Sequence, residues 1–220
     1  NAILGAETPA SSATRREAFA STTDAVARWL VAHQIALSPV KGRVDAHPTA
    51  SGARRNGRVL ASAPFDRRKL GPLVELLRAS DYEVEIAPRS ARGLVAAASV
   101  LGHRLLNPTK DVVTGGAALA GGLLLAASQS GARLMPSSEL VSLEIEGGRV
   151  AGAVLRRDRK ETTVRARWGV LLATGGFEAN ADWRREHLPL PTDASWTTGL
   201  ASNLGGGIKA AQDAGAQLAE

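Results

Sequence analysis

The segment Gly169–Ala173 is a continuous apolar run that ends in Thr174-Gly175-Gly176. A short run without polar alternation is typical of a strand buried on both faces, as in a parallel sheet covered by helices. A glycine pair after such a strand lets the backbone approach a flat or phosphorylated ligand, because no Cβ stands in the way. The alternative is a tight strand-to-loop turn that binds nothing. The run therefore predicts an α/β fold and marks the turn as a candidate ligand site.

The residues before this run predict a helix and an antiparallel meander. A helix is expected over 117–130, stopped by Gly131. Residues 141–145 and 150–154 alternate between apolar and polar on either side of Gly147-Gly148, which is a strong hairpin pattern. A further strand is expected over 162–166. The order helix, meander, buried strand and glycine turn indicates a β-meander attached to a parallel-sheet nucleotide domain.

The first half of the chain has weaker patterns. A helix is expected from Arg15, because Phe19, Val26 and Leu30 fall on one helical face. Residues 38–57 contain several Pro and Gly residues and predict a long irregular loop. Further helices are expected over 70–77 and 94–106.

Charge and composition argue against several functional classes. The chain has 27 basic and 21 acidic residues, but its arginines are scattered and aromatic residues make up only 4%, which disfavours a nucleic-acid module. The longest apolar stretch, 117–127, is well short of the roughly 20 residues that span a bilayer. Cysteine is absent, and no signal peptide pattern is visible, so we expect a soluble, cytoplasmic protein. The four histidines show no metal-ligand spacing, so no metal site is expected.

Five ordered blocks resemble the 3-ketosteroid dehydrogenase and fumarate reductase superfamily of flavoproteins. Residues 169–180 resemble its "GVVLATGGF..N" segment, and residues 115–131 resemble its "GG.AL...LL.AA...G" helix. Residues 141–152 match its "V..L...dGRV.GV" hairpin, and residues 203–216 resemble "NTGDGI......GA". Residues 64–71 look like the "PFDGR.LG" stretch of the ketosteroid dehydrogenase branch.

This resemblance implies FAD as the cofactor and nominates its contacts. In the resembled family the Ala-Thr-Gly-Gly turn lies against FAD, a backbone position in the hairpin meets the adenine, and the glycine-rich turn downstream reaches the flavin side. The corresponding cofactor-binding residues here are Val141, Ala173, Thr174, Gly175, Gly176, Asn203, Gly205, Gly206 and Gly207.

Two positions depart from the family pattern. Gly206 stands where the family has an acidic residue, which removes one hydrogen-bond acceptor for the cofactor. Ala46 stands where ketosteroid dehydrogenases carry a tyrosine that we expect to serve catalysis, and alanine cannot exchange a proton. His47 is a candidate substitute, although a lone loop histidine is more often solvated than catalytic. The catalytic residues are otherwise not assigned.

The resemblance also implies a division of the chain. Residues 1–178 are expected to form part of an FAD-binding, Rossmann-like domain with an antiparallel meander. Residues 179–220 are expected to begin an α+β substrate-capping domain. No G-x-G-x-x-G motif occurs in the chain, and the family carries that motif N-terminal to the blocks found here. We therefore expect a fragment of a longer enzyme that is inactive alone.

The expected function is dehydrogenation of a ketosteroid-like, apolar substrate at a carbon–carbon bond, with an electron acceptor that is not identified. Two alternatives stay open within the resemblance. One is a fumarate reductase-like ene-reductase, and the other is a degenerate, non-catalytic paralogue, which Ala46 and Gly206 motivate. A basic nucleic-acid module is the alternative from a different class.

Overall fold

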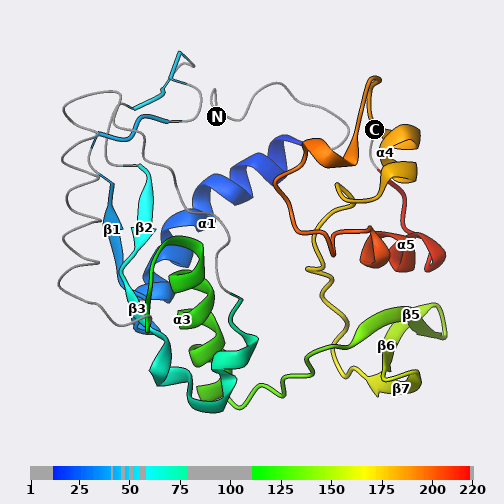
Figure 1. Ribbon diagram of the computed structural model, residues 1–220. Coiled ribbons are helices and arrows are strands. Elements are labelled where there is room, and N and C mark those ends of the chain that lie inside the picture. Colours follow the sequence, from blue (N-terminus) through cyan, green and yellow to red (C-terminus); the bar gives the residue numbers. More distant parts are fainter. Residues whose placement is uncertain are drawn as a thin grey trace. The chain divides into compact units, whose positions relative to one another are not determined.

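A computed structural model describes residues 12–40, 42–45, 48–49, 52–54, 58–78 and 111–218. The chain divides into two compact units, Asn1–Leu134 and Met135–Glu220, and each is described here by itself. The predicted boundary near residue 179 is a different division and stays a prediction. The described chain contains both helices and strands, which confirms a mixed fold (Figure 1).

The predicted helix from Arg15 is confirmed as α1, Ala13–Ala32. The hydroxyl of Ser12 caps its start and accepts a hydrogen bond from the Arg15 N–H at 3.3 Å. No residue of α1 is buried, and the side chains of Phe19 and Val26 are 66% and 55% exposed. The apolar face that predicted the helix is therefore not part of the core of this unit.

The core of the first unit forms around α3, Gly115–Gln129, which confirms the helix predicted over 117–130. This helix packs against short antiparallel pairs. They are β1 (Leu37–Pro39) with β2 (Leu60–Ser62), and β3 (Phe65–Asp66) with β4 (Val112–Val113).

Two glycines set the spacing between α3 and its neighbours. A Cβ on Gly121 would lie 2.7 Å from Cδ1 of Phe65, and one on Gly122 would lie 2.9 Å from Cγ1 of Ile35. These distances are shorter than van der Waals contact, so the helix can sit this close only without side chains there.

The helix predicted over 70–77 is present in part, as the 3₁₀ segment η2, Arg67–Leu76. It is kinked at Gly71, whose φ is 53°, and Pro72 follows. Both residues break a regular helix, which explains why this one does not continue as an α-helix. The helix predicted over 94–106 lies outside the described residues.

The described parts of the predicted loop 38–57 are irregular apart from the end of β1. The side chain of Asp45 is buried in this loop. Its Oδ2 accepts the backbone N–H of Arg54 at 2.8 Å and pairs with Nη1 of Arg58 at 3.1 Å. The Asp45 carboxylate thus links the first half of the loop to Arg54 and Arg58 near its end.

The second unit opens with the predicted meander, which is confirmed. Strands β5 (Glu139–Glu146), β6 (Arg149–Arg157) and β7 (Lys160–Arg165) pair antiparallel in that order. Gly147 and Gly148 form the first turn with φ of 56° and 75°, as a type I′ turn requires. The register shifts between Leu140 and Ser142, so Val141 has no partner residue on β6. Val141 is therefore the extra residue of a β-bulge.

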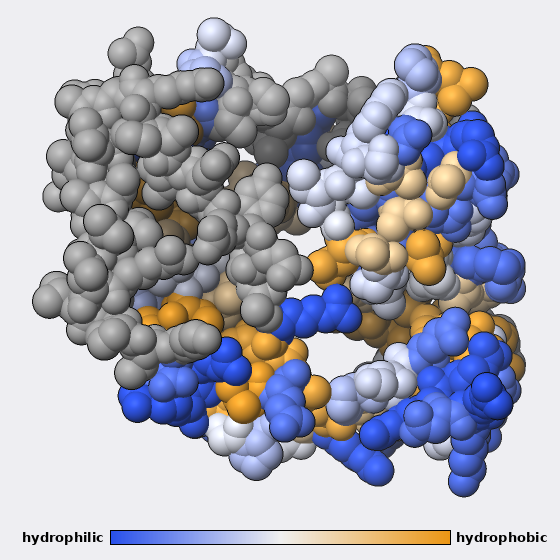
Figure 2. Space-filling model, in the orientation of Figure 1, coloured by the Kyte–Doolittle hydropathy of each residue, from blue (hydrophilic) through white to orange (hydrophobic). Residues whose placement is uncertain are grey.

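Charged side chains cover this meander, and Figure 2 shows the hydrophilic surface over it. Arg156 pairs with Glu161 at 2.8 Å and with Glu139 at 3.4 Å, while Arg165 pairs with Glu146 at 2.8 Å. These ion pairs are exposed, so they make the outer surface of the sheet hydrophilic and contribute little to its stability. The arginines of the meander are thus surface charges paired with carboxylates.

The predicted buried strand at Gly169–Ala173 is wrong for this structure. The segment forms no strand, and Leu171 is 91% exposed. A strand exists only where its N–H and C=O groups meet another strand, and no strand among the described residues pairs with this segment. All sheets of the described chain are antiparallel, so the predicted parallel sheet is also not observed within it.

The rest of the second unit is made of short helices. They are α4 (Ala181–His187), η3 (Ala194–Trp196) and α5 (Gly206–Asp213), and α5 packs against β5. The side chain of Asn180 caps α4 by accepting hydrogen bonds from the backbone N–H groups of Asp182 and Trp183, each at 3.1 Å. Of the helices in the described ranges, none is long and apolar enough to cross a membrane.

The packing of α3 predicts opposite effects for two glycines of the same helix. Gly121→Ala places a methyl group against the Phe65 ring and should lower the free energy of unfolding by about 1–3 kcal/mol. Gly116→Ala is the matched control, because its added Cβ meets nothing within 4 Å. It should stabilise α3 by up to about 1 kcal/mol through helix propensity. Urea unfolding of both variants measures the difference, and equal shifts would contradict the packing.

Asp66 predicts a pH-dependent contribution to stability. Its carboxylate caps η2, and the hydrogen bond from the Arg68 side chain is the main cause that lowers the pKa of Asp66 from 3.8 to about 2. Stabilisation by the charged form is complete above pH 3.8 and is lost as the pH falls through about 2. Asp66→Asn should therefore have a lower Tm than the parent at pH 7, with the gap closing below pH 3.8. A gap that stays constant down to the lower pKa would contradict this assignment.

Candidate functional site

The predicted ligand turn, residues 173–176, holds a conformation that only glycine adopts easily. Gly175 has a φ of 79°, in the left-handed region that L-residues rarely occupy. A Cβ there would also lie 2.7 Å from Oδ1 of Asn203. Geometry and space therefore both require glycine, and the side chain of Asn203 lies directly beside the turn.

A second glycine turn packs onto the first. Gly205 caps the start of α5 with a φ of 86°, and its N–H donates to the carbonyl of Gly176 at 3.1 Å. A Cβ on Gly205 would lie 2.8 Å from Cζ3 of Trp183 and 3.0 Å from Cβ of Phe177. The aromatic pair thus closes one side of this turn, and the hydrogen bond fixes its distance from Gly176.

The closest approach joins Gly207 to Thr174. Gly207 is buried, and a Cβ on it would lie 2.9 Å from both Cβ and Cγ2 of Thr174 and closer still to its hydroxyl. The first turn of α5 therefore rests on the side chain of Thr174. A larger residue at either position would separate the helix from the turn.

A cavity of about 260 Å³ lies between the turn and α5. Its walls are mainly small or apolar, with a few polar groups, which is the usual character of a ligand site. The lining residues are Leu172, Ala173, Thr174, Gly175, Gly207, Ile208, Ala211, Gln212, Ala216, Gln217 and Leu218.

The structure brings most of the predicted cofactor-binding residues together. Ala173, Thr174, Gly175 and Gly207 line the cavity. The others do not line it. Gly176 ends the turn and accepts the hydrogen bond from Gly205, while Asn203 lies beside Gly175. Gly206 is exposed in the first turn of α5, with open space around its Cβ position. Val141 lies on β5, the strand against which α5 packs.

The chemistry of these groups fits part of a dinucleotide cofactor. The backbone N–H groups of the first turn of α5 have no partner within the helix, and the helix dipole makes this end favourable for negative charge. Thr174 adds a hydroxyl, and the remaining walls are apolar. The bulge at Val141 frees backbone groups from the ladder, as a contact to an adenine edge requires. Gly206 supplies no carboxylate, so this turn offers hydrogen-bond donors rather than an acidic acceptor.

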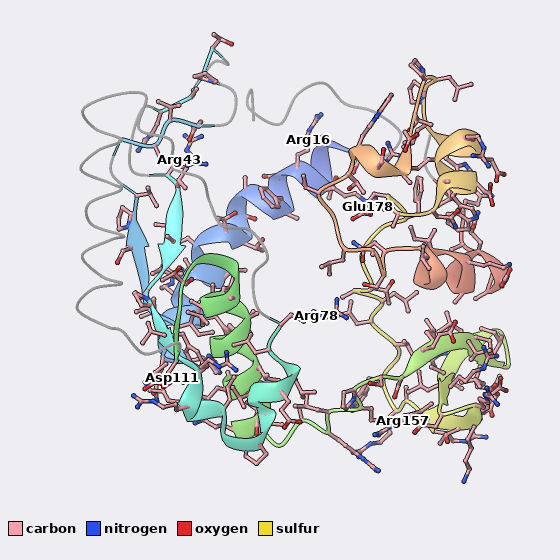
Figure 3. The ribbon with its side chains drawn as sticks, in the orientation of Figure 1. Arg16, Arg43, Arg78, Asp111, Arg157 and Glu178 are labelled. Atoms are coloured by element: carbon pink, nitrogen blue, oxygen red, sulfur yellow. The ribbon has the colours of Figure 1, made fainter. Side chains whose placement is uncertain are left out.

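A carboxylate lies behind the two turns (Figure 3). Oε1 of Glu178 accepts a hydrogen bond from Nδ2 of Asn203 at 2.6 Å. This bond is the main cause that lowers the pKa of Glu178, and the positive charge of Arg184 adds to it. Glu178 is therefore ionised at neutral pH.

Sequence reasoning missed the α5 wall and two polar groups. Ile208 and Ala211 line the cavity, and their spacing of three residues in a helix could have placed them on one face. Asn180 lies in the resembled block, and the structure gives its role: it caps α4 and donates from Nδ2 to the carbonyl of Leu204 at 3.0 Å. Glu178 showed no pattern in the sequence that would have marked it.

The two candidate catalytic positions, Ala46 and His47, lie outside the described residues. His33 hydrogen-bonds the carbonyl of Trp29 at 2.8 Å and stacks on that ring, and His187 packs against Phe177. In the described ranges, no three His, Asp or Glu side chains gather as metal ligands.

Comparison with known proteins identifies relatives of most of the chain. Residues 5–220 match the FAD binding domain family. The 3-oxosteroid 1-dehydrogenase of Mycobacterium tuberculosis is 32% identical over 200 residues, covering 81% of this chain and 36% of that protein. The 3-oxosteroid 1-dehydrogenase of Comamonas testosteroni is 30% identical over 198 residues, covering 80% of this chain and 35% of that protein.

A solved structure has a similar backbone. It is the 3-ketosteroid Δ1-dehydrogenase of Sterolibacterium denitrificans in complex with 1,4-androstadiene-3,17-dione. Its TM-score is 0.76 at 28% identity, over 91% of this chain and 40% of that one. The chain thus spans little more than a third of the length of the relatives it matches.

Substitutions at two neighbouring glycines of α5 should have different effects on stability. Gly207→Ala forces a methyl group into the Thr174 side chain and should lower the free energy of unfolding by about 1–3 kcal/mol. Gly206→Ala is the matched control, because nothing lies within 4 Å of its added Cβ, and it should be neutral or stabilise by up to about 1 kcal/mol. Thermal unfolding compares them. Equal stability of the two variants would show that α5 does not rest on Thr174.

Proposed function

The chain belongs to the FAD binding domain family, and on that premise we propose that the cavity between residues 173–176 and α5 holds part of FAD in an oxidoreductase. The observation that carries this proposal is a pair of close contacts made by glycines, Gly175 against Asn203 and Gly207 against Thr174. Two turns approach each other at distances that exclude side chains, yet they leave a cavity of about 260 Å³ between turn and helix.

The residues of this chain would bind and orient the cofactor. The N–H groups in the first turn of α5 would donate to its polar atoms, and the Thr174 hydroxyl would add a further hydrogen bond. Leu172 and Ile208 would exclude water from its apolar surface. When bound, FAD supplies the hydride-accepting chemistry of such enzymes.

The proposed substrate is an apolar 3-oxosteroid, dehydrogenated at a carbon–carbon bond. Support comes from the relatives, which are 3-oxosteroid 1-dehydrogenases, and from the similar backbone of an enzyme solved with a steroid. The relatives favour this substrate class over a fumarate-like acid. Within the proposal, residues 1–178 contribute to the FAD-binding domain and residues 179–220 begin the part that covers the substrate.

FAD binding is the direct test. Titration of the chain with FAD, followed by flavin fluorescence, should show saturable binding. Gly175→Ala should weaken it at least about tenfold, because the methyl group meets Asn203 and the left-handed φ becomes strained. Gly116→Ala, in the other unit, is the control and should bind as the parent does. Absence of binding, or equal binding by Gly175→Ala, would contradict the proposed site.

Turnover tests the substrate. The full-length protein, incubated with a 3-oxosteroid and an artificial electron acceptor, should yield a product lighter by two hydrogen atoms, seen by mass spectrometry. FAD binding without such a product would favour the non-catalytic paralogue, which the missing carboxylate at Gly206 motivates.

A further inference from the structure

Glu178 occupies a space that two glycines leave open. A Cβ on Gly176 would lie 2.7 Å from Oε2 of Glu178, and a Cβ on Gly199 would lie 2.8 Å from its Cγ. The carboxylate is thus enclosed from two sides by backbone. Any side chain at either glycine would displace the carboxylate, so its observed position requires glycine at both residues.

The carboxylate determines the orientation of one amide. Nδ2 of Asn203 donates to Oε1 of Glu178 at 2.6 Å. An ionised carboxylate only accepts hydrogen bonds, so it must face Nδ2 and leaves Oδ1 on the other side of the amide. The amide lies beside Gly175, with Oδ1 2.7 Å and Nδ2 3.0 Å from the Cβ position of that glycine. Glu178 therefore holds the amide beside the turn through its hydrogen bond to Nδ2.

Other contacts fix both residues in place. The backbone N–H of Ala179 donates to the carbonyl of Asn203 at 3.1 Å, and Nη1 of Arg184 donates to the carbonyl of Glu178 at 3.3 Å. The first bond holds the two backbones together whatever the Glu178 side chain does, and the second joins the Glu178 backbone to α4. The side chain is thus not needed to join the segments, which leaves the orientation of the Asn203 amide as its specific contribution.

We propose that Glu178 is a positioning residue of the cofactor site, which holds the Asn203 amide against the Gly175 turn. Glu178 does not line the cavity, so it acts on the ligand only through Asn203 and Gly175. The inference rests on the proposed binding of FAD. It predicts that FAD affinity depends on a hydrogen-bond acceptor at position 178 and on free space at Gly199.

Three variants separate the acceptor from the side-chain volume. Glu178→Ala removes the acceptor and should weaken FAD binding at least about tenfold, the usual cost of losing a charged hydrogen bond. Glu178→Gln keeps an acceptor oxygen of the same reach and should stay within about threefold of the parent. Glu186→Ala is the matched control, because Glu186 is exposed on α4 and should leave the affinity unchanged.

Gly199→Ala tests the same contact from the other side. Its methyl group would lie 2.8 Å from Cγ of Glu178 and displaces that side chain, so it should weaken FAD binding as much as Glu178→Ala. The double variant Glu178→Ala/Gly199→Ala should be no weaker than Glu178→Ala alone, because the displaced group has gone. Fluorescence titration gives the affinities, and circular dichroism shows that each variant is folded.

Loss of affinity in Glu178→Ala and Gly199→Ala, recovery in Glu178→Gln and non-additivity in the double variant support the inference. If Glu178→Ala does not fold, Gly199→Ala and Glu178→Gln decide by the same comparison. FAD binding by the parent with equal binding by Gly199→Ala overturns the role of Glu178 and leaves the proposed function standing. A parent chain that binds no FAD overturns both.

Discussion

The contact between the turn at residues 173–176 and the first turn of α5 is the constraint on which the second unit depends. It exists because glycines stand where side chains would collide: Gly175 against Asn203, Gly205 against Trp183 and Gly207 against Thr174. Once these distances are set, a single hydrogen bond from Gly205 to Gly176 aligns the two turns. The start of α5, the carboxylate behind the turn and the cavity in front of it all follow from that alignment.

The same device serves a different purpose in the first unit. There Gly121 and Gly122 bring α3 against Phe65 and Ile35, and the result is a packed core. A close approach made by glycine is therefore not itself evidence of a ligand. What distinguishes the second unit is a larger cavity, about 260 Å³ against about 120 Å³ beside Gly122 in the first unit, and its place beside helix N–H groups that have no partner within the helix. The distinction rests on this geometry, which residue types alone do not reveal.

Local patterns in the sequence predicted α1, α3 and the meander well, because each is stabilised by contacts between residues close in the chain. The apolar run at Gly169–Ala173 was misassigned because a buried strand depends on partners elsewhere, and composition cannot show whether they are present. For the site, the resemblance nominated the glycines and Asn203, which the structure brings together around the turn. It missed Glu178, since a carboxylate that acts by orienting a neighbouring amide has no spacing of its own. Ile208 and Ala211 became part of the site only when α5 was placed against the turn.

Hydrogen–deuterium exchange of the chain with and without FAD tests whether FAD binds between the 173–176 turn and α5. Binding there should slow exchange in peptides covering residues 172–176 and 205–212, with no change in β7 or α3, which contribute no residue to the cavity lining. Unchanged exchange in both site peptides at saturating FAD, or protection confined to other segments, would contradict it.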